Sequence, residues 1–335
     1  MEKVDILLAT YNGENYIKEQ LDSILNQTYT DFRLLISDDM STDGTYEILK
    51  DYEKKDKRIT VFKQEKNLGV VSNFEFLLSK VQNKYYAFSD QDDIWNNDKL
   101  EKTISKLEKE NADLVFTDLE VVDNNKNTIY KSYWELKEFK DKILKYNSFE
   151  ALYLNNYVTG CTIVAKADTI KKCLPLPKTS KFVLHDYWIA LIISQSGKIV
   201  FLEEPTIKYR QHKNNKVGSK KKSETMNFKE IRKMFIDVKK EHFKVFIENE
   251  NKFEDEEIKN LNKKALSYYE KLEKTKIINF SNWNLFFKLY KYENKKYVLE
   301  NFLILNVPII AGPLISLRSI LKGMKKWAKK RKILL

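Results

Sequence analysis

Acidic side chains with metal-binding chemistry lie close together in residues 89–95, which read SDQDDIW. Asp90 and Asp92 stand two positions apart in this acidic turn. Carboxylate oxygens are the ligands that Mg²⁺ and Mn²⁺ prefer, usually with phosphate oxygens completing the shell. The sequence contains no glycine-rich loop with a lysine to hold phosphates, so a metal ion is the expected neutraliser of any bound phosphate. The structural alternative is an acidic turn that caps a helix starting near Asn97.

Polar residues also end two other apolar runs. Residues 4–10 lead into Thr10-Tyr11-Asn12, and residues 32–39 end in Asp38-Asp39. One such group is ordinary turn chemistry, because Asp and Asn are common after strands. Three groups that end three strands predict a binding site, because ligands of open α/β sheets bind at the carboxyl ends of the strands.

The elements that would position these residues alternate between strand and helix patterns. Apolar runs predict strands at 4–10, 32–39, 59–63, 84–90 and 113–118, and helical spacing predicts helices at 14–26, 42–55, 70–81 and 97–111. Residues 146–212 predict a helix at 146–155, a strand at 159–166, a helix opening at His185-Asp186, and two strands, KIVFLEEP and TIKYRQH. This alternation favours an α/β fold with a mostly parallel sheet covered by helices.

Composition and charge divide the chain into two parts. Of the 335 residues 42% are hydrophobic, enough for a large core, and two cysteines exclude a disulfide scaffold. Residues 1–215 carry 31 Lys and Arg against 34 Asp and Glu, whereas residues 216–335 carry 29 against 14. We therefore predict an α/β domain at 1–217 and a basic helical region at 218–335. The basic part suits either nucleic acid or an anionic membrane surface.

Seven motifs, in order, resemble those of the family 2 glycosyltransferases. They are ATYNG (9–13), SDDMSTDGT (37–45), NLG (67–69) with Asn73, SDQDDIW (89–95), TGCTIVAK (159–166), HDYW (185–188) and YRQH (209–212). The last three resemble the rhamnosyltransferase-like subgroup of polysaccharide assembly. The resemblance covers about residues 1–215 and implies the GT-A fold, an α/β sandwich that binds nucleotide sugars.

The resemblance also implies roles for individual residues. Asp186 matches the catalytic base, Asp92 the metal ligand of the DxD-type motif, and Asp39 the acceptor of the uracil or thymine ring N–H. The matched nucleotide and donor positions are Thr10, Tyr11, Glu14, Asn73 and Asp90. Two positions depart from the family: His185 stands where Glu is frequent, and Met40 stands where Gly is usual.

Four further residues are interpreted from their own chemistry. His212 either completes the metal shell or contacts the diphosphate, and the structural alternative is a hydrogen-bonded histidine at a strand end. Gly160 would let the donor sugar approach the backbone closely. Cys161 is predicted to be a small buried residue. His242 is predicted to lie on the surface of the helical region.

We therefore expect an inverting, metal-dependent transfer from a UDP- or dTDP-sugar to a hydroxyl of a glycan or lipid-linked glycan. Asp186 would deprotonate that hydroxyl, and Mg²⁺ or Mn²⁺ would neutralise the diphosphate. The alternatives are a sugar-phosphate nucleotidyltransferase, which would need a lysine-containing phosphate loop near the first strand, and a basic nucleic-acid-binding protein. Acidic residues interspersed along the basic helices argue against nucleic acid.

The last third contains one candidate membrane segment. Residues 302–317 are apolar but contain Pro308 and Pro313, and they are shorter than the about 20 residues that span a bilayer. Cations interleaved with Leu321, Met324 and Trp327 follow. With no signal sequence at the start, we expect a cytoplasmic protein held peripherally at the inner face of the cell membrane by an interfacial anchor. The alternative is a packing helix pair with a basic tail.

Overall fold

A computed structural model describes residues 2–137, 139, 148–212, 227–274, 283–291 and 295–306. The chain divides into two compact units. The first comprises Met1–Ser219 with Asn251–Glu254, and the second comprises Lys220–Glu250 with Asp255–Leu335. The domain boundary predicted at residue 217 lies outside the described residues.

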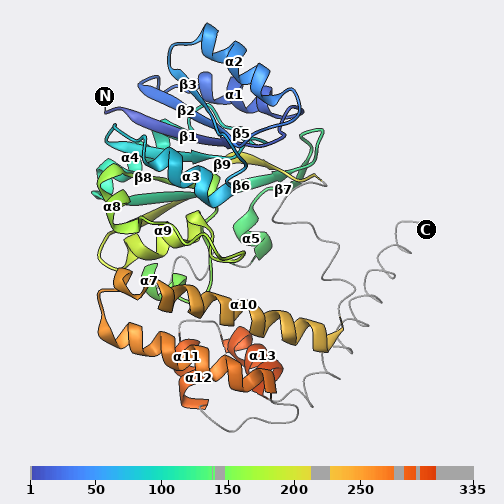
Figure 1. Cartoon of the computed structure of the whole chain (residues 1–335), viewed down its shortest axis with the longest axis vertical. Coiled ribbons are helices and arrows are strands. Elements are labelled where there is room, and N and C mark those ends of the chain that lie inside the picture. Colours follow the sequence, from blue (N-terminus) through green and yellow to red (C-terminus); the bar gives the residue numbers. More distant parts are fainter. Residues whose placement is uncertain are drawn as a thin grey trace, which may run out of the picture. The chain divides into compact units, whose positions relative to one another are not determined.

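The first unit is built on a nine-stranded sheet in the order β3-β2-β1-β4-β8-β6-β9-β5, with β7 paired to β6. β1 (Val4–Thr10) lies between β2 (Phe32–Asp38) and β4 (Tyr85–Ser89) and is parallel to both (Figure 1). β3 (Ile59–Lys63) continues the sheet beyond β2. The chain moves outward from β1 through β2 to β3 and then returns to the other side of β1. The carboxyl ends of β1 and β4 therefore form a switch point, where ligands bind in open α/β sheets.

The other half of the sheet is mixed. β8 (Val164–Lys166) runs antiparallel to β4 and β6 (Leu114–Val122), and β6 is parallel to β9 (Ile199–Arg210). β5 (Ile94–Trp95) and β7 (Thr128–Tyr130) are short antiparallel partners of β9 and β6.

Two sequence-based predictions in this half were wrong. KIVFLEEP and TIKYRQH form one strand, because the register shift opposite Asp118 accommodates Pro205, which has no N–H to donate. Residues 160–162, predicted as strand, form a 3₁₀ turn before β8.

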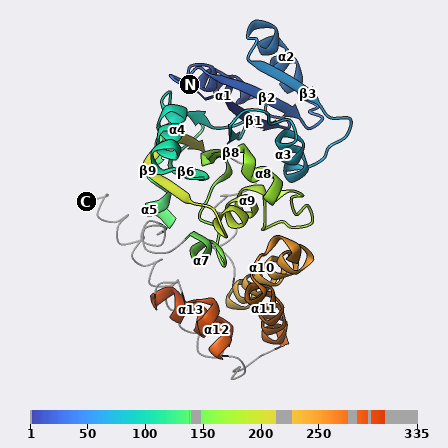
Figure 2. The same ribbon diagram turned by 90° about the vertical axis from the view of Figure 1, so that its left-hand side faces the viewer.

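Helices cover both faces of the sheet (Figure 2). Residues Ile6 and Leu8 of β1 share one core with apolar residues of α1 (Ile17–Leu25), α2 (Thr45–Lys55) and α4 (Lys99–Glu110). α3 (Val70–Leu78) and α9 (His185–Ser194) pack together on the other face. Strands buried on both sides read as unbroken apolar runs, which is the pattern of the first strands. The α/β prediction is confirmed. The short helices α5 (Tyr133–Lys137), α7 (Ser148–Leu152) and α8 (Ile170–Cys173) lie in the connections.

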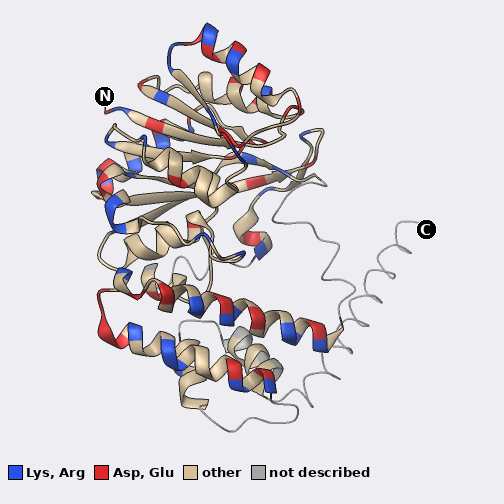
Figure 3. Cartoon of the chain, in the orientation of Figure 1, with Lys and Arg blue, Asp and Glu red and all other residues tan. Residues whose placement is uncertain are grey.

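The second unit is helical, with α10 (Phe228–Glu248), α11 (Glu256–Lys274), α12 (Trp283–Leu289) and α13 (Lys295–Asn306). Lys, Arg, Asp and Glu alternate along α10 and α11 (Figure 3). Its buried residues include both aromatic and aliphatic side chains, among them Phe243, Phe246, Tyr268 and Leu272. The prediction that His242 is a surface residue was wrong: its ring is buried 4.2 Å from that of Phe246.

None of the described helices is long and apolar enough to cross a membrane. Of the predicted interfacial segment, residues 302–306 belong to α13, while residues 307–317 and the basic tail lie outside the described residues.

Candidate active site

The acidic turn after β4 is joined to the end of β1 by a two-point amide contact. The Gln91 side chain accepts from the N–H of Tyr11 at 2.9 Å and donates to the carbonyl oxygen of Tyr11 at 3.0 Å. Gly13 is needed beside it, because a Cβ there would lie 2.3 Å from Gln91 Oε1. The polar ends of β1 and β4 are thus held together at the switch point, as the sequence predicts. Sequence reasoning missed Gln91, although it is the middle residue of the acidic motif.

The turn after β2 is ordered by side chains that follow β1. Asn12 Oδ1 accepts from the N–H of Thr42, and Glu14 Oε2 accepts from the N–H of Gly44, both at 2.8 Å. Thr10 Oγ1 donates to Asp38 Oδ1 at 3.2 Å. Met40 has φ 66° with its side chain exposed, so the left-handed turn forms although the usual Gly is absent.

The Asp39 carboxylate fixes the loop that precedes α3. Its two oxygens accept from the N–H groups of Leu68 at 2.6 Å and Gly69 at 2.9 Å. These bonds leave lone pairs for a further donor, because an ionised carboxylate has about four acceptor sites. Nearby, Asn73 Nδ2 donates to the carbonyl of Ser37, while its buried Oδ1 has no hydrogen-bond partner among the described residues. The predicted base-binding positions therefore share one end of the sheet.

The carboxylates of Asp90, Asp92 and Asp186 converge near the carboxyl ends of β1 and β4. The pKa of Asp90 is raised to about 7, first by burial and then by the negative charges of Asp92 and Asp186. Asp90 and Asp92 follow β4, whereas Asp186 lies in the first turn of α9, so the fold brings residues from distant segments together. A cation would relieve the repulsion that raises the pKa of Asp90.

Asp92 and His212 form the part of this cluster best suited to a metal. His212 Nε2 lies 2.7 Å from Asp92 Oδ2, and both side chains are mostly buried. The His212 ring stacks on Tyr16 with ring centres 4.6 Å apart. The carboxylate oxygen is a ligand that suits Mn²⁺ or Mg²⁺ when phosphate oxygens complete the shell, and the imidazole nitrogen favours the transition metal Mn²⁺ over Mg²⁺. The residues present therefore fit the predicted divalent cation.

Asp186 is oriented by two backbone groups. Its Oδ2 accepts from the N–H of Gly160 at 3.1 Å, and its Oδ1 accepts from the N–H of Tyr187 at 2.7 Å. A Cβ at Gly160 would lie 3.0 Å from His185 Nε2, so this glycine accommodates the His185-Asp186 pair. The buried His185 ring stacks on Phe74, with ring centres 4.1 Å apart, and burial lowers its pKa. His185 is thus held neutral within the core.

A second group of possible metal ligands includes the buried residues Asp93 and Cys161. Ligand atoms of Asp90, Asp93 and Cys161 lie within 4.8 Å of one another. Burial raises the pKa of the Cys161 thiol well above its usual value, so the thiol stays protonated and is a poor ligand. Asp93 Oδ1 accepts from the backbone N–H of Arg210 at 3.3 Å. The start of α4 has Asp98 at its N-cap and no side-chain cap hydrogen bond, so the acidic turn does not cap this helix. The Asp92–His212 pair is the better candidate metal centre.

Comparison with known proteins decides the family. The sequence profile of Glycosyl transferase family 2 matches residues 5–168. The dTDP-rhamnosyl transferase RfbG of Shigella flexneri is 33% identical over 223 residues, which is 63% of this chain and 74% of that protein. The chain belongs to glycosyl transferase family 2. The UDP-Glc:alpha-D-GlcNAc-diphosphoundecaprenol beta-1,3-glucosyltransferase WfgD of Escherichia coli is 31% identical over 196 residues, 58% of this chain and 71% of that enzyme.

Solved structures of glycosyltransferases share the fold of this family member. S. aureus TarS in complex with UDP-GlcNAc has a TM-score of 0.55 at 17% identity, over 90% of this chain and 78% of that one. The mannosyltransferase PcManGT from Pyrobaculum calidifontis, in complex with GDP-Man and Mn²⁺, has a TM-score of 0.54 at 15% identity, over 97% and 83%. The predicted GT-A fold is confirmed.

Proposed function

We propose that this chain transfers a sugar from a UDP- or dTDP-sugar to a hydroxyl of a glycan or lipid-linked glycan, with inversion, in cell-surface polysaccharide synthesis. The observation that carries the proposal is the convergence of Asp90, Asp92 and Asp186 next to the Asp39 end of the sheet. The names of RfbG and WfgD, which specify dTDP-rhamnose and UDP-glucose transfer, support a pyrimidine nucleotide donor. Family membership favours this function over nucleotidyl transfer or nucleic-acid binding.

Asp186 would act as the general base. Two backbone N–H groups orient its carboxylate in the first turn of α9, and a carboxylate has acceptor sites left for the acceptor hydroxyl. Once Asp186 takes the proton, the hydroxyl oxygen attacks the anomeric carbon as the bond to the diphosphate breaks. A single displacement of this kind inverts the anomeric configuration.

The leaving diphosphate would be placed against Asp92 and His212. A divalent cation held there supplies neutralisation of the negative charge that develops on the leaving group. The Asp39 carboxylate would accept the ring N–H of uracil or thymine with the lone pairs left by Leu68 and Gly69. Thr10, Tyr11 and Glu14 would surround the base and ribose from β1 and the turn that follows it.

A donor screen tests the proposed function. The purified full chain is incubated with a membrane extract and, separately, UDP-Glc, UDP-GlcNAc, dTDP-rhamnose or GDP-Man, and release of nucleoside diphosphate is measured. We expect release from at least one uridine or thymidine donor and none from GDP-Man, because the names of RfbG and WfgD favour a pyrimidine nucleotide, whose ring N–H the proposal assigns to Asp39. Release from GDP-Man alone would contradict the pyrimidine assignment.

We also propose that the last third holds the enzyme at an anionic membrane surface, next to a lipid-linked acceptor. Phe287 and Leu299 are exposed by 49% and 58% and add apolar surface. In this proposal the contact with the membrane depends mainly on the sequence after Asn306, which is apolar as far as residue 317 and then basic, and each Lys or Arg near an anionic surface contributes about 1 kcal/mol.

Truncation after Asn306 is expected to release the protein from vesicles that contain anionic lipid, without changing UDP binding. This end point keeps α13 whole, including the hydrogen bond of 2.8 Å from the Tyr268 hydroxyl to Asn306 Oδ1. Co-flotation of the full and truncated chains with vesicles at low salt measures the difference. A full-length chain that does not float with the vesicles would assign the tail to folding or oligomerisation instead.

A further inference from the structure

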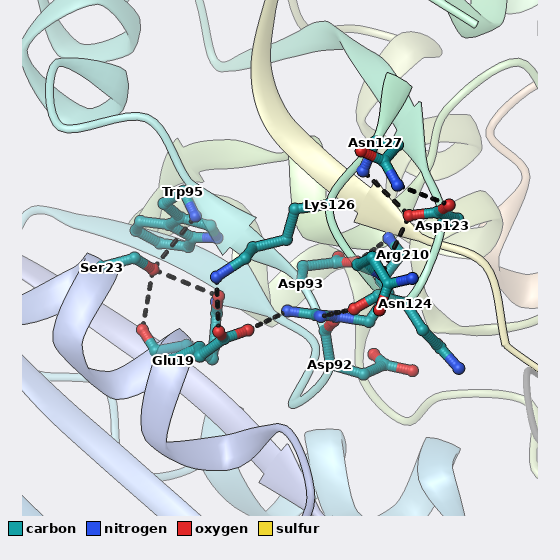
Figure 4. Close-up of polar contacts among 12 residues, drawn as sticks. Glu19, Ser23, Asp92, Asp93, Trp95, Asp123, Asn124, Lys126, Asn127 and Arg210 are labelled. Atoms are coloured by element: carbon teal, nitrogen blue, oxygen red, sulfur yellow. Dashed lines mark hydrogen bonds and ion pairs between the residues drawn. The ribbon is translucent and has the colours of Figure 1, made fainter. Parts of the chain in front are cut away.

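Arg210 contacts three segments that are distant in sequence: α1, the acidic turn after β4, and the turn between β6 and β7 (Figure 4). It is the last residue of β9, two positions before His212, and its side chain is only 3% exposed. Its Nε donates to the carbonyl oxygen of Asp92, and its Nη1 donates to the carbonyl oxygen of Asn124, both at 3.0 Å. Its Nη2 forms an ion pair with Glu19.

The groups around Arg210 are themselves tied down. Glu19, on α1, also pairs with Lys126 of the β6–β7 turn, with Nζ 2.8 Å from Oε1. The hydrogen bond from Lys126 is the largest effect and lowers the pKa of Glu19. Burial acts in the opposite direction, but Arg210 also lowers this pKa, so Glu19 stays ionised. Asp123 closes the same turn by accepting from the N–H groups of Asn125 and Asn127. The guanidinium is therefore held from two sides independently of Asp92.

Arg210 contacts one proposed metal ligand directly and is linked to the other through Tyr16, without being a ligand itself. It fixes the Asp92 peptide directly through the bond to the carbonyl. Its guanidinium carbon lies 5.2 Å from the centre of the Tyr16 ring, which in turn stacks on His212. Only Arg offers several N–H donors in one rigid plane as well as a cation for an aromatic ring, so Lys could not make all of these contacts.

We propose that Arg210 is a positioning residue that holds Asp92 and His212 in the orientation needed to bind the divalent cation. The inference rests on the proposed metal-dependent transfer. Partners of this kind, one step removed from the metal, typically contribute about 10–100-fold to metal affinity or activity.

The test is a titration of the purified full chain with Mn²⁺ in the presence of UDP, following the electron paramagnetic resonance signal of free Mn²⁺. Arg210→Met is expected to weaken Mn²⁺ binding by about 10–100-fold, and Arg210→Lys to restore only part of it. The matched control is Arg58→Met. Arg58 directly precedes β3. It likewise pairs with a carboxylate, that of Asp56, and lies over an aromatic ring, that of Phe32. Its loss should leave Mn²⁺ affinity unchanged.

A second variant keeps the test decisive if Arg210→Met does not fold. Glu19→Gln removes the charge that holds the guanidinium while keeping the size of a 42% exposed side chain, and a weaker Mn²⁺ affinity is again expected. If the parent chain binds Mn²⁺ and the folded variants bind it equally well, the positioning role is overturned and the proposed function stands. If the parent chain binds no Mn²⁺, the proposed metal centre is wrong and the inference falls with it.

Discussion

Asp186→Asn is expected to lower the rate of sugar transfer by about 10²–10⁴-fold, the usual contribution of a general base. Asparagine has the same shape and can still accept from the N–H of Gly160 or Tyr187, so the start of α9 should keep its structure. It cannot take the proton of the acceptor hydroxyl. Nucleoside diphosphate release measures turnover, and calorimetric titration with UDP should show unchanged nucleotide binding.

Asp168→Asn is the control for this change. Asp168 is an exposed carboxylate of the same unit, in the short turn before α8, and its loss should leave turnover unchanged. Turnover of Asp186→Asn close to that of the parent would remove Asp186 from the role of base.

Asp92→Ala is expected to reduce transfer by about 10³-fold or more, because a bound metal contributes several kcal/mol of charge stabilisation. EDTA should inactivate the parent chain to the same extent, and added Mg²⁺ or Mn²⁺ should restore activity. The variant should not respond to added metal at concentrations that restore the parent.

Asp98→Ala separates this effect from the loss of any single negative charge in the same unit. Asp98 directly precedes α4 and pairs with Lys102 at 2.7 Å, so its variant should remain active and sensitive to EDTA. Full activity of the parent chain in EDTA would mean that cationic side chains, rather than a metal, neutralise the diphosphate.

The parallel core of the fold could be predicted because each strand is an apolar run and each helix has its own spacing. β9 could not be predicted as one strand, because Pro205 suggested a break. Only the pairing with β6 shows that a register shift accommodates the proline within a continuous strand. His242 was misplaced because charged neighbours dominate α10 in sequence. The spacing to Phe246, one helical turn away, was the available signal that His242 faces the interior.

The polar ends of the strands were predictable because parallel strands present their carboxyl ends at one edge. Contacts between side chains from distant segments were not predictable from the sequence. Arg210 belongs to the YRQH motif, but nothing in the sequence indicates that its side chain contacts both Asp92 and Glu19. The neutral, stacked state of His185 depends on Phe74, more than a hundred positions earlier in the chain. The contact of His185 with Phe74 follows from the packing of α3 against α9 and becomes visible only in the structure.

The most direct test of sugar transfer at this site measures nucleoside diphosphate released and labelled sugar incorporated into glycan in the same reaction. The parent chain, supplied with its uridine or thymidine donor and membrane extract, should yield the two products in equal amounts. The Asp186→Asn variant should yield neither above background. Release of nucleoside diphosphate without incorporation of sugar, or equal incorporation by parent and variant, would contradict the account.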